Sequence, residues 1–110
     1  MPDNIEDQQL NNPQILSWWY TYVLQSKKDK QWYTGYTDDL RKRFQEHNKG
    51  LVFSTRKRRP FELIYYEACF NEQDAKIREQ YLKSGVGKKY IKNRLKFFLS
   101  GAAQKSPRIQ

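Results

Sequence analysis

The strongest constraint on the fold is a change of periodicity early in the chain. Residues 18–26, WWYTYVLQS, and residues 31–37, QWYTGYT, are rich in aromatic and β-branched side chains, which favours β-strands. The polar residues between them, KKDK, fit a tight turn, so the two strands are predicted to form an antiparallel hairpin. From Leu40 onward apolar residues recur at helical spacing, which predicts a helix that ends near Asn48, before Gly50.

Local signals also predict the start of this helix and the strand that follows it. Thr37 is a plausible N-cap, which would put Asp38 and Asp39 in the first turn, where the helix dipole favours acidic side chains. Residues 51–60, LVFSTRKRRP, are predicted to form a basic loop. Residues 61–70, FELIYYEACF, are apolar enough to form a third strand at the centre of the sheet.

Two further helices complete the predicted order. Asn71 is a suitable N-cap for a helix over residues 72–84. The SGVG segment at residues 84–87 is expected to break that helix, and residues 88–99 are predicted to form a last helix with one apolar side. The predicted fold class is therefore α/β (α+β), in the order ββαβαα, with a small three-stranded antiparallel sheet flanked by helices.

The ends of the chain differ from this region in composition and charge. Residues 1–17 are rich in Asn and Gln and carry no Lys or Arg, and residues 100–110 are similarly polar. We therefore expect a disordered N-terminal tail, one domain over residues 18–99 and a flexible C-terminal tail. The formal net charge of the chain is +9, and the domain carries +10 because the N-terminal residues contribute −3 and the C-terminal residues +2. A domain this basic suggests a polyanionic partner, nucleic acid first and an anionic lipid surface second.

Composition argues against several other classes of protein. No apolar run reaches membrane-spanning length, and the N-terminus lacks the cationic and apolar regions of a signal peptide. The single cysteine, Cys69, has no partner for an internal disulfide, and no group of Cys and His residues has zinc spacing. A cytoplasmic protein with no membrane partner fits these features best.

Charged residues occupy helix positions that should face the sheet. Four residues at i, i+3, i+4 and i+7 of the first predicted helix share one face: Leu40, Arg43, Phe44 and His47. Since Leu40 and Phe44 must pack on the sheet, the other two are expected to point along the sheet rather than fully into water. On the second predicted helix, the same spacing places Glu79 beside core-facing residues.

The hairpin brings two phenols into the same region. Side chains alternate along a strand, and a short hairpin places Tyr22 and Tyr33 on adjacent strands. Taken singly, these residues have structural explanations: the tyrosines pack between strands, Arg43 lies at the edge of the stripe, and His47 and Glu79 find local partners. Taken together, they are the residue types that serve phosphodiester hydrolysis, because a carboxylate can hold a divalent cation, an arginine can neutralise a phosphate, and a tyrosine or histidine can take a proton from water.

In order and spacing these residues resemble the GIY-YIG nucleases. The resemblance runs from about Trp18 to Leu99. The first half of the family motif lacks its Gly and Ile here, so only its tyrosine carries over. The positions that carry the resemblance are Tyr22 in YTY, Tyr33 and Gly35 in YTG, Arg43 and His47 in LRKRFQEH, and Glu79 in REQYLKSG.

The resemblance implies a divalent-metal-dependent DNA endonuclease that hydrolyses phosphodiester bonds, in DNA repair or recombination. Tyr22 and Tyr33 would line the site, one of them acting as general base or orienting the attacking water. Arg43 would contact the scissile phosphate, and His47 would position water or shuttle a proton. Glu79 would hold one Mg²⁺ or Mn²⁺, with waters at the remaining positions.

A loop and a helix supply further candidate contacts with nucleic acid. The residues expected to contact the DNA backbone are Ser54, Thr55, Arg56, Lys57, Arg58, Arg59, Lys88 and Lys89. A solvated basic loop is the structural alternative. Phosphate contacts carry no sequence information, so we expect selectivity for DNA structure, or a targeting protein partner, rather than sequence preference. RNA remains open as a substrate, and the alternative function is a catalytically weak or silent nucleic-acid-binding module of the same fold.

Overall fold

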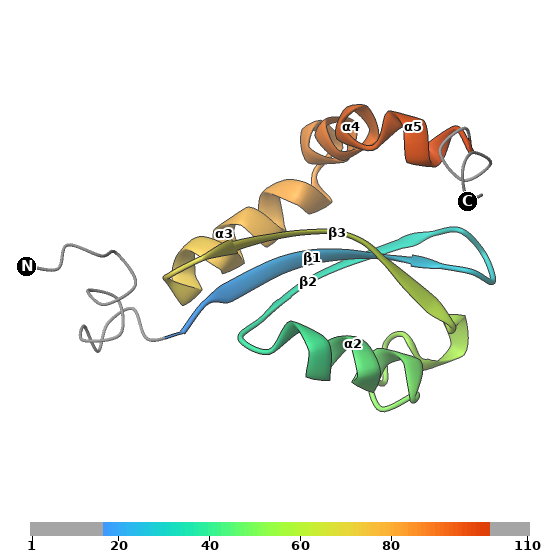
Figure 1. The fold of residues 1–110 in the computed structure, drawn as a ribbon, viewed down its shortest axis with the longest axis horizontal. Coiled ribbons are helices and arrows are strands. Elements are labelled where there is room, and N and C mark those ends of the chain that lie inside the picture. The colour runs from blue at the N-terminus through green and yellow to red at the C-terminus, as the bar shows by residue number, and fades with distance from the viewer. Residues whose placement is uncertain (1–16, 102–110) are drawn as a thin grey trace, which may run out of the picture. The chain divides into compact units, whose positions relative to one another are not determined.

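The computed structural model describes residues 17–101 and has an α+β fold built on a three-stranded antiparallel sheet (Figure 1). The strands are β1 (Trp19–Ser26), β2 (Trp32–Thr37) and β3 (Phe61–Cys69). The helices are α2 (Leu40–Asn48), α3 (Glu72–Lys83), α4 (Gly85–Arg94) and α5 (Lys96–Leu99), and a 3-10 turn, η2, covers Arg56–Arg58. The predicted order of strands and helices is confirmed, whereas the predicted tails lie almost wholly outside the described residues.

The chain divides into two compact units. The first ends at Glu79 and contains the sheet, α2 and the first part of α3, and the second begins at Gln80 and contains α4 and α5. The single domain expected over residues 18–99 stays a prediction. None of the helices within residues 17–101 is long and apolar enough to cross a membrane.

The first strand, and not the third, lies at the centre of the sheet. The strand order is β2-β1-β3, with Tyr22 of β1 opposite Gly35 of β2 and Tyr66 of β3. Residues 21–24 of β1 are all buried, whereas β3 is half-buried or exposed after its first residue. The prediction that residues 61–70 form the central strand is therefore wrong.

Paired hydroxyl groups explain how a strand with polar residues can be central. Thr21 is 2% exposed, and its Oγ1 donates to the carbonyl of Ala75 in α3 over 2.9 Å. Ser26 is 0% exposed, and its Oγ donates to the carbonyl of Arg58 over 2.6 Å. Burying a hydroxyl costs little free energy once it is hydrogen-bonded. Apolar content alone therefore predicted the wrong strand at the centre of the sheet.

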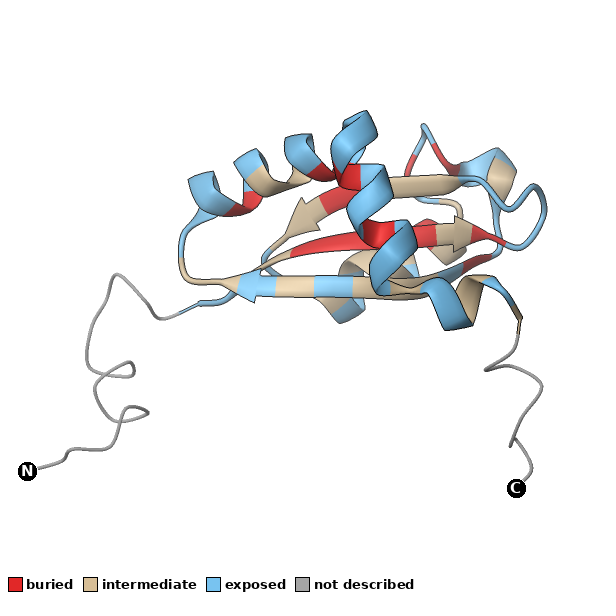
Figure 2. Cartoon of the chain, turned by 90° about the horizontal axis from the view of Figure 1, so that it is seen from above, coloured by how far each residue is buried: buried red, intermediate tan, exposed pale blue. Residues whose placement is uncertain are grey.

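Two faces of the sheet carry different helices, and the buried residues concentrate on the central strand (Figures 1 and 2). On the face that we call the α2 face, Tyr22 and Leu24 pack with Phe61, and Leu40 and Phe44 of α2 pack against them. The helical spacing of the sequence predicted this contact. On the opposite face, which we call the α3 face, Thr21 bonds to α3 as described above. The α2 face therefore holds the core beside the candidate site.

The first helix begins later than the sequence predicted. Its N-cap is Asp39, whose carboxylate accepts from the backbone N of Lys42 over 3.1 Å, and the first turn contains no acidic residue. Thr37 is still paired with Tyr20 in the sheet, and its hydroxyl accepts from the backbone N of Asp39 over 3.1 Å. The prediction of Thr37 as N-cap, with Asp38 and Asp39 in the first turn, is wrong because the strand continues to Thr37.

The SGVG segment starts a helix as well as ending one. Ser84 is the N-cap of α4, and its hydroxyl accepts from the backbone N of Gly87 over 3.1 Å. Gly87 is buried, and a Cβ there would overlap the carbonyl of Tyr81, so glycine permits this close approach. The single helix predicted over residues 88–99 is corrected to two helices that meet at Leu95.

Candidate active site

The hydroxyl of Tyr22 is the centre of the candidate site. Tyr22 is 1% exposed, and its hydroxyl lies 3.0 Å from Nε2 of His47. Gly35 lies opposite Tyr22, and a Cβ at this glycine would be 2.6 Å from the Tyr22 hydroxyl oxygen. The second half of the motif therefore needs glycine, because the Tyr22 hydroxyl occupies the space that a side chain would fill.

Tyr33 lies on the same face of the sheet, diagonal to Tyr22. The strand register places Tyr33 opposite Leu24. The ring centroids of Tyr22 and Tyr33 are 6.4 Å apart, and those of Tyr33 and His47 are 4.9 Å apart. Tyr33 is half-buried, so it is the more exposed of the two phenols. The structure thus brings together the two tyrosines that the alternation of side chains placed on adjacent strands.

Arg43 of α2 acts on the Tyr22 hydroxyl from the surface. Its side chain is 37% exposed, and its Nη1 donates to the Glu46 carboxylate over 3.0 Å. The positive charge of the guanidinium lowers the pKa of Tyr22, against the effect of burial. Arg43 is therefore a partly exposed cation that acts on a buried phenol.

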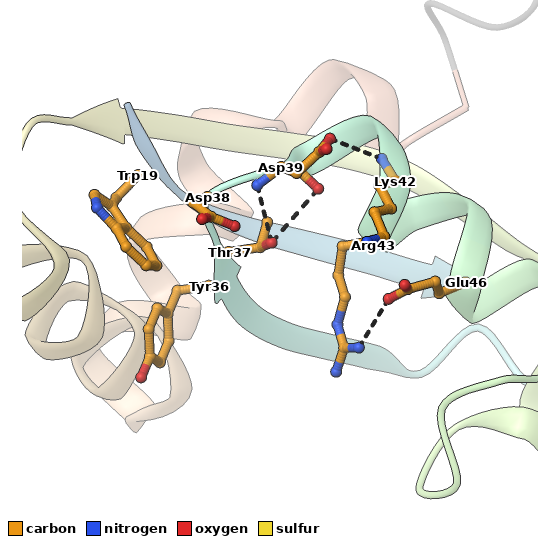
Figure 3. Close-up of a pocket in the computed structure, with 8 residues that line it drawn as sticks. All are labelled: Trp19, Tyr36, Thr37, Asp38, Asp39, Lys42, Arg43 and Glu46. Carbon is orange, nitrogen blue, oxygen red and sulfur yellow. Dashed lines mark hydrogen bonds and ion pairs between the residues drawn. The ribbon is translucent and has the colours of Figure 1, made fainter. Parts of the chain in front are cut away.

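An open pocket gives access to this arginine (Figure 3). Its volume is about 630 Å³, and it lies between the start of β1, the end of β2 and the start of α2. Trp19, Tyr36, Lys42 and Arg43 are among its lining residues. Asp38 and Asp39 line it too, so the pocket is mixed in charge and Arg43 is not part of a purely cationic surface.

Burial leaves Tyr22 and His47 uncharged at neutral pH. Burial, followed by the charge of Tyr33, raises the pKa of Tyr22 to about 12, although Arg43 acts in the opposite direction. Burial, followed by the positive charge of Arg43, lowers the pKa of His47 to about 4. The site therefore contains a neutral phenol and a neutral imidazole in hydrogen-bond contact.

His47 is held from both sides of its ring. It is 0% exposed, and its Nδ1 lies 2.8 Å from Oγ1 of Thr55. Thr55 is also 0% exposed, and its hydroxyl donates to the carbonyl of Val52 over 3.5 Å. The expectation that Arg43 and His47 both point along the sheet fits Arg43 alone, because His47 points into the core behind Tyr22.

Glu79 of α3 acts on Tyr22 through its charge. It is the last of the groups that shift the pKa of Tyr22, after burial, Tyr33 and Arg43, and its negative charge raises that pKa. Within residues 17–101, no group of three or more His, Cys, Asp and Glu side chains could hold a metal ion. A single carboxylate fits a hard cation that keeps most of its waters, such as Mg²⁺, and does not fit a metal held entirely by protein ligands.

The basic loop contains one arginine that acts as a structural brace. Nε of Arg58 lies 3.3 Å from the Asp29 carboxylate, and its Nη2 donates to the carbonyl of Trp32 over 3.4 Å. Arg58 is half-buried, so it ties the loop to the hairpin rather than presenting its charge to solvent. The loop cations that are exposed are Arg56, Lys57 and Arg59.

The other predicted nucleic-acid contacts fall in different positions. Ser54 is exposed, but Thr55 is buried against His47, so the predicted contact between the Thr55 hydroxyl and a phosphate does not fit the structure. Lys88 and Lys89 are exposed on α4, in the second unit. No direct signal in the sequence indicates the role of Thr55, because a hydroxyl in a basic loop is more commonly a surface group.

Comparison with known proteins identifies the family. The family model described as the GIY-YIG catalytic domain matches residues 18–93. This span is more than half of the chain, so the chain belongs to the GIY-YIG family, which is a family of nucleases. The match includes every residue of the candidate site: Tyr22, Tyr33, Arg43, His47 and Glu79.

Individual relatives carry a family number and no stated activity. The UPF0213 protein YazA of Bacillus subtilis is 43% identical over 72 residues, which are 64% of this chain and 71% of that protein. A UPF0213 protein of Pediococcus acidilactici is 44% identical over 80 residues, which are 67% of this chain and 81% of that protein. The solution NMR structure of a UPF0213 protein from Bacillus halodurans is 35% identical and covers 67% of this chain and 81% of its own, with a TM-score of 0.43.

Proposed function

We propose that the protein is a divalent-metal-dependent DNA endonuclease that hydrolyses phosphodiester bonds at the site around Tyr22, Arg43 and Glu79. The observation that carries this proposal is the 3.0 Å hydrogen bond between the buried Tyr22 hydroxyl and Nε2 of His47. This bond gives the Tyr22 proton a path, and the positive charge of the partly exposed Arg43, the group best suited to bind a phosphate, acts on the same hydroxyl. Membership of the GIY-YIG family supports the same conclusion.

Arg43 is the residue that would bind the scissile phosphate. Its ion pair with Glu46 involves Nη1, and a guanidinium has five N–H donors, so other donors are available to a substrate. A phosphate bound there would lie next to the Tyr22 hydroxyl. Arg43 would also stabilise the negative charge that develops on the phosphate oxygens in the transition state.

Tyr22 needs a proton acceptor behind it to act as general base. With a pKa of about 12, Tyr22 keeps its proton at neutral pH, so it can take one from water only if it gives up its own. Nε2 of neutral His47, 3.0 Å away, is the acceptor in contact with it. In this mechanism Tyr22 is the base, His47 shuttles its proton, and the more exposed Tyr33 orients the attacking water.

Glu79 would hold Mg²⁺ or Mn²⁺ through its carboxylate, with waters completing the coordination. When bound, such an ion supplies positive charge to the phosphate oxygens and lowers the pKa of a bound water. The remaining steps belong to the side chains of this chain: Arg43 binds and orients the phosphate, and Tyr22 and His47 move the proton.

The exposed cations would bind the DNA backbone. Arg56, Lys57 and Arg59 of the basic loop, with Ser54 beside them, and Lys88 and Lys89 of α4 present charge without a base-reading element. We therefore propose selectivity for DNA structure, or targeting by a protein partner, in repair or recombination in the cytoplasm. RNA stays open as a substrate.

The test is cleavage of labelled DNA in four forms: duplex, single-stranded, flap and four-way junction. Each is incubated with Mg²⁺, Mn²⁺ or a chelator, and wild type is run beside Glu79→Gln. We expect metal-dependent cuts by wild type that vanish in the variant. Salt-sensitive binding without cleavage by either protein would contradict the proposal. Such a result would favour a silent nucleic-acid-binding module. This is the second candidate function, because Tyr22 is only 1% exposed.

A further inference from the structure

We propose that Thr55 is a positioning residue that holds His47 in the tautomer with hydrogen on Nδ1, so that the lone pair of Nε2 faces the Tyr22 hydroxyl. The effect of this arrangement on catalysis rests on the proposed nuclease function. The tautomer itself is a property of the free protein and can be measured without a substrate.

Three buried side chains form one continuous hydrogen-bonded chain. The Tyr22 hydroxyl lies 3.0 Å from Nε2 of His47, and Nδ1 of the same ring lies 2.8 Å from Oγ1 of Thr55. Tyr22 is 1% exposed, and His47 and Thr55 are both 0% exposed. Both ring nitrogens are therefore occupied by protein hydroxyls in an environment with little solvent.

The donor at the Thr55 end of this chain sets its direction. The Thr55 hydroxyl donates to the carbonyl of Val52 over 3.5 Å, so its oxygen is the acceptor toward His47. Nδ1 must then carry the hydrogen that it donates to Thr55. Nε2 is left as the acceptor of the Tyr22 hydroxyl hydrogen, and every group donates and accepts in one direction.

The opposite tautomer fits these partners poorly. With hydrogen on Nε2, the Tyr22 oxygen would accept from His47, and its own hydrogen would be turned away from the imidazole. Thr55 would have to give up its bond to the carbonyl of Val52 to donate to Nδ1. Tyr22 would then lose the acceptor that allows it to pass on a proton.

The loop backbone fixes the position of Thr55. The backbone N atoms of Thr55 and Arg56 both donate to the carbonyl of Val52, over 3.1 and 3.0 Å. Val52 is 8% exposed, whereas Phe53 between these anchors is 80% exposed. Val52 and Thr55 thus anchor the loop inward, and the Thr55 hydroxyl is held at His47 by more than its own hydrogen bond.

The sequence makes the tautomer unusually easy to measure, since His47 is its single histidine. In ¹⁵N-labelled protein with any purification tag removed, long-range ¹H–¹⁵N correlation of the imidazole needs no assignment. The variants are Thr55→Val, which keeps the shape and removes the hydroxyl, and Thr55→Ser, which keeps the hydroxyl. Wild type and Thr55→Ser should show hydrogen on Nδ1, and Thr55→Val should shift toward hydrogen on Nε2.

Cleavage by the same proteins tests the consequence. Under single-turnover conditions Thr55→Val should be about 10- to 100-fold slower than wild type, the size of effect found when a residue that orients a functional histidine is lost. Thr55→Ser should restore most of the rate, and DNA affinity should be equal in all three proteins, because Thr55 is buried. Circular dichroism confirms that each variant is folded.

Two results would overturn the proposal. One is a wild-type spectrum with hydrogen on Nε2, which decides the question even if Thr55→Val does not fold. The other is a folded Thr55→Val protein that keeps both the Nδ1 tautomer and the wild-type rate. If no substrate is cleaved but the tautomer shifts in Thr55→Val, the positioning role of Thr55 stands and the proposed nuclease function fails.

Discussion

The two faces of the sheet contain the same kinds of polar side chain in different arrangements. On the α3 face, Nε and Nη2 of Arg78 donate to both oxygens of Glu67, over 2.8 and 2.9 Å. The Tyr65 hydroxyl donates to the same carboxylate over 2.8 Å. On the α2 face, Arg43 instead makes one bond to a carboxylate, from Nη1 to Glu46 over 3.0 Å, and its charge also acts on the neutral hydroxyl of Tyr22.

This difference separates a structural brace from a candidate site. The guanidinium of Arg78 is engaged in a bidentate pair with a carboxylate, which is strong, geometrically specific and neutral overall. Arg43 is bound to its carboxylate, Glu46, through Nη1, and its charge also acts on the oxygen of Tyr22, which is connected through His47 to Thr55. The residue types alone do not define the site, and the way in which each arginine is engaged does.

Replacing each arginine in turn should produce the largest effect that distinguishes the two faces. Arg43→Ala should slow single-turnover cleavage by about 10²- to 10³-fold, because it removes the donor to the transition-state phosphate. Arg78→Ala should leave cleavage nearly unchanged and lower the free energy of unfolding by about 1 kcal/mol, measured by urea denaturation. Equal losses of cleavage in the two variants would show that the faces do not differ in this way.

Adding one methyl group at Gly35 should disturb the α2 face alone. The Cβ of Gly35→Ala would lie 2.6 Å from the Tyr22 hydroxyl oxygen and 3.2 Å from a ring carbon of Tyr33. Since the Tyr22 ring is buried, we expect a loss of about 1–3 kcal/mol in unfolding free energy from overpacking, together with a large loss of cleavage.

The control for this change is Gly85→Ala, at the start of α4. Nothing lies within 4 Å of a Cβ at Gly85, so this variant should be as stable as wild type or slightly more stable. Thermal unfolding and cleavage of both variants check the prediction. A Gly35→Ala protein that cleaves like Gly85→Ala would rule out close approach of the Tyr22 hydroxyl as the reason for glycine.

Acidification should destabilise the protein through His47. Its pKa is lowered from 6.5 to about 4 in the folded state, so at intermediate pH the unfolded chain binds a proton that the folded chain does not. This contribution to stability is complete above the unfolded pKa and is lost as the pH falls toward the folded one, up to about 3 kcal/mol.

Urea unfolding at about pH 7.5 and about pH 4.5 measures this loss, with His47→Gln as the control. The variant lacks the titrating ring, so its stability should fall by clearly less than that of wild type over the same interval. Equal losses in the two proteins would mean that His47 is not the buried neutral imidazole that the structure shows.

The smallest expected effects are those of single cations in the basic loop. Arg56→Ala and Lys57→Ala should each weaken DNA binding a few-fold and reduce the salt slope by about 1. Arg58→Ala should change the slope less and lower stability instead, because Arg58 is paired with Asp29. Fluorescence anisotropy between about 50 and 200 mM salt checks these slopes. If Arg58→Ala also reduced the salt slope by about 1, Arg58 would have to leave Asp29 and contact a phosphate when DNA binds.

Local periodicity was enough to predict the side chains that meet at Tyr22. The predicted hairpin placed Tyr22 and Tyr33 on adjacent strands, and helical spacing placed Arg43 and His47 on the stripe of the first helix that faces the sheet. Both follow from geometry within one element or between neighbouring strands, so they require no knowledge of the whole fold. The structure adds the reason for Gly35, which is the space taken by the Tyr22 hydroxyl.

Features that depend on contacts distant in sequence were not predictable. β1 is central because the hydroxyls of Thr21 and Ser26 find carbonyl partners in α3 and in the basic loop. The burial of Thr55 likewise depends on His47, eight residues earlier, and on the way the loop folds back. In each case a polar residue is buried by a partner that composition and periodicity do not identify.

The most direct test of the central claim compares one tyrosine from each face. Tyr22→Phe and Tyr65→Phe each remove a single hydroxyl, from the hydrogen bond with His47 and from the Glu67 carboxylate respectively. Single-turnover cleavage is measured at saturating DNA and Mg²⁺. We predict that Tyr22→Phe is at least about 100-fold slower than wild type while Tyr65→Phe keeps the wild-type rate. A Tyr22→Phe protein that cleaves at the wild-type rate would contradict the assignment of the site to the α2 face.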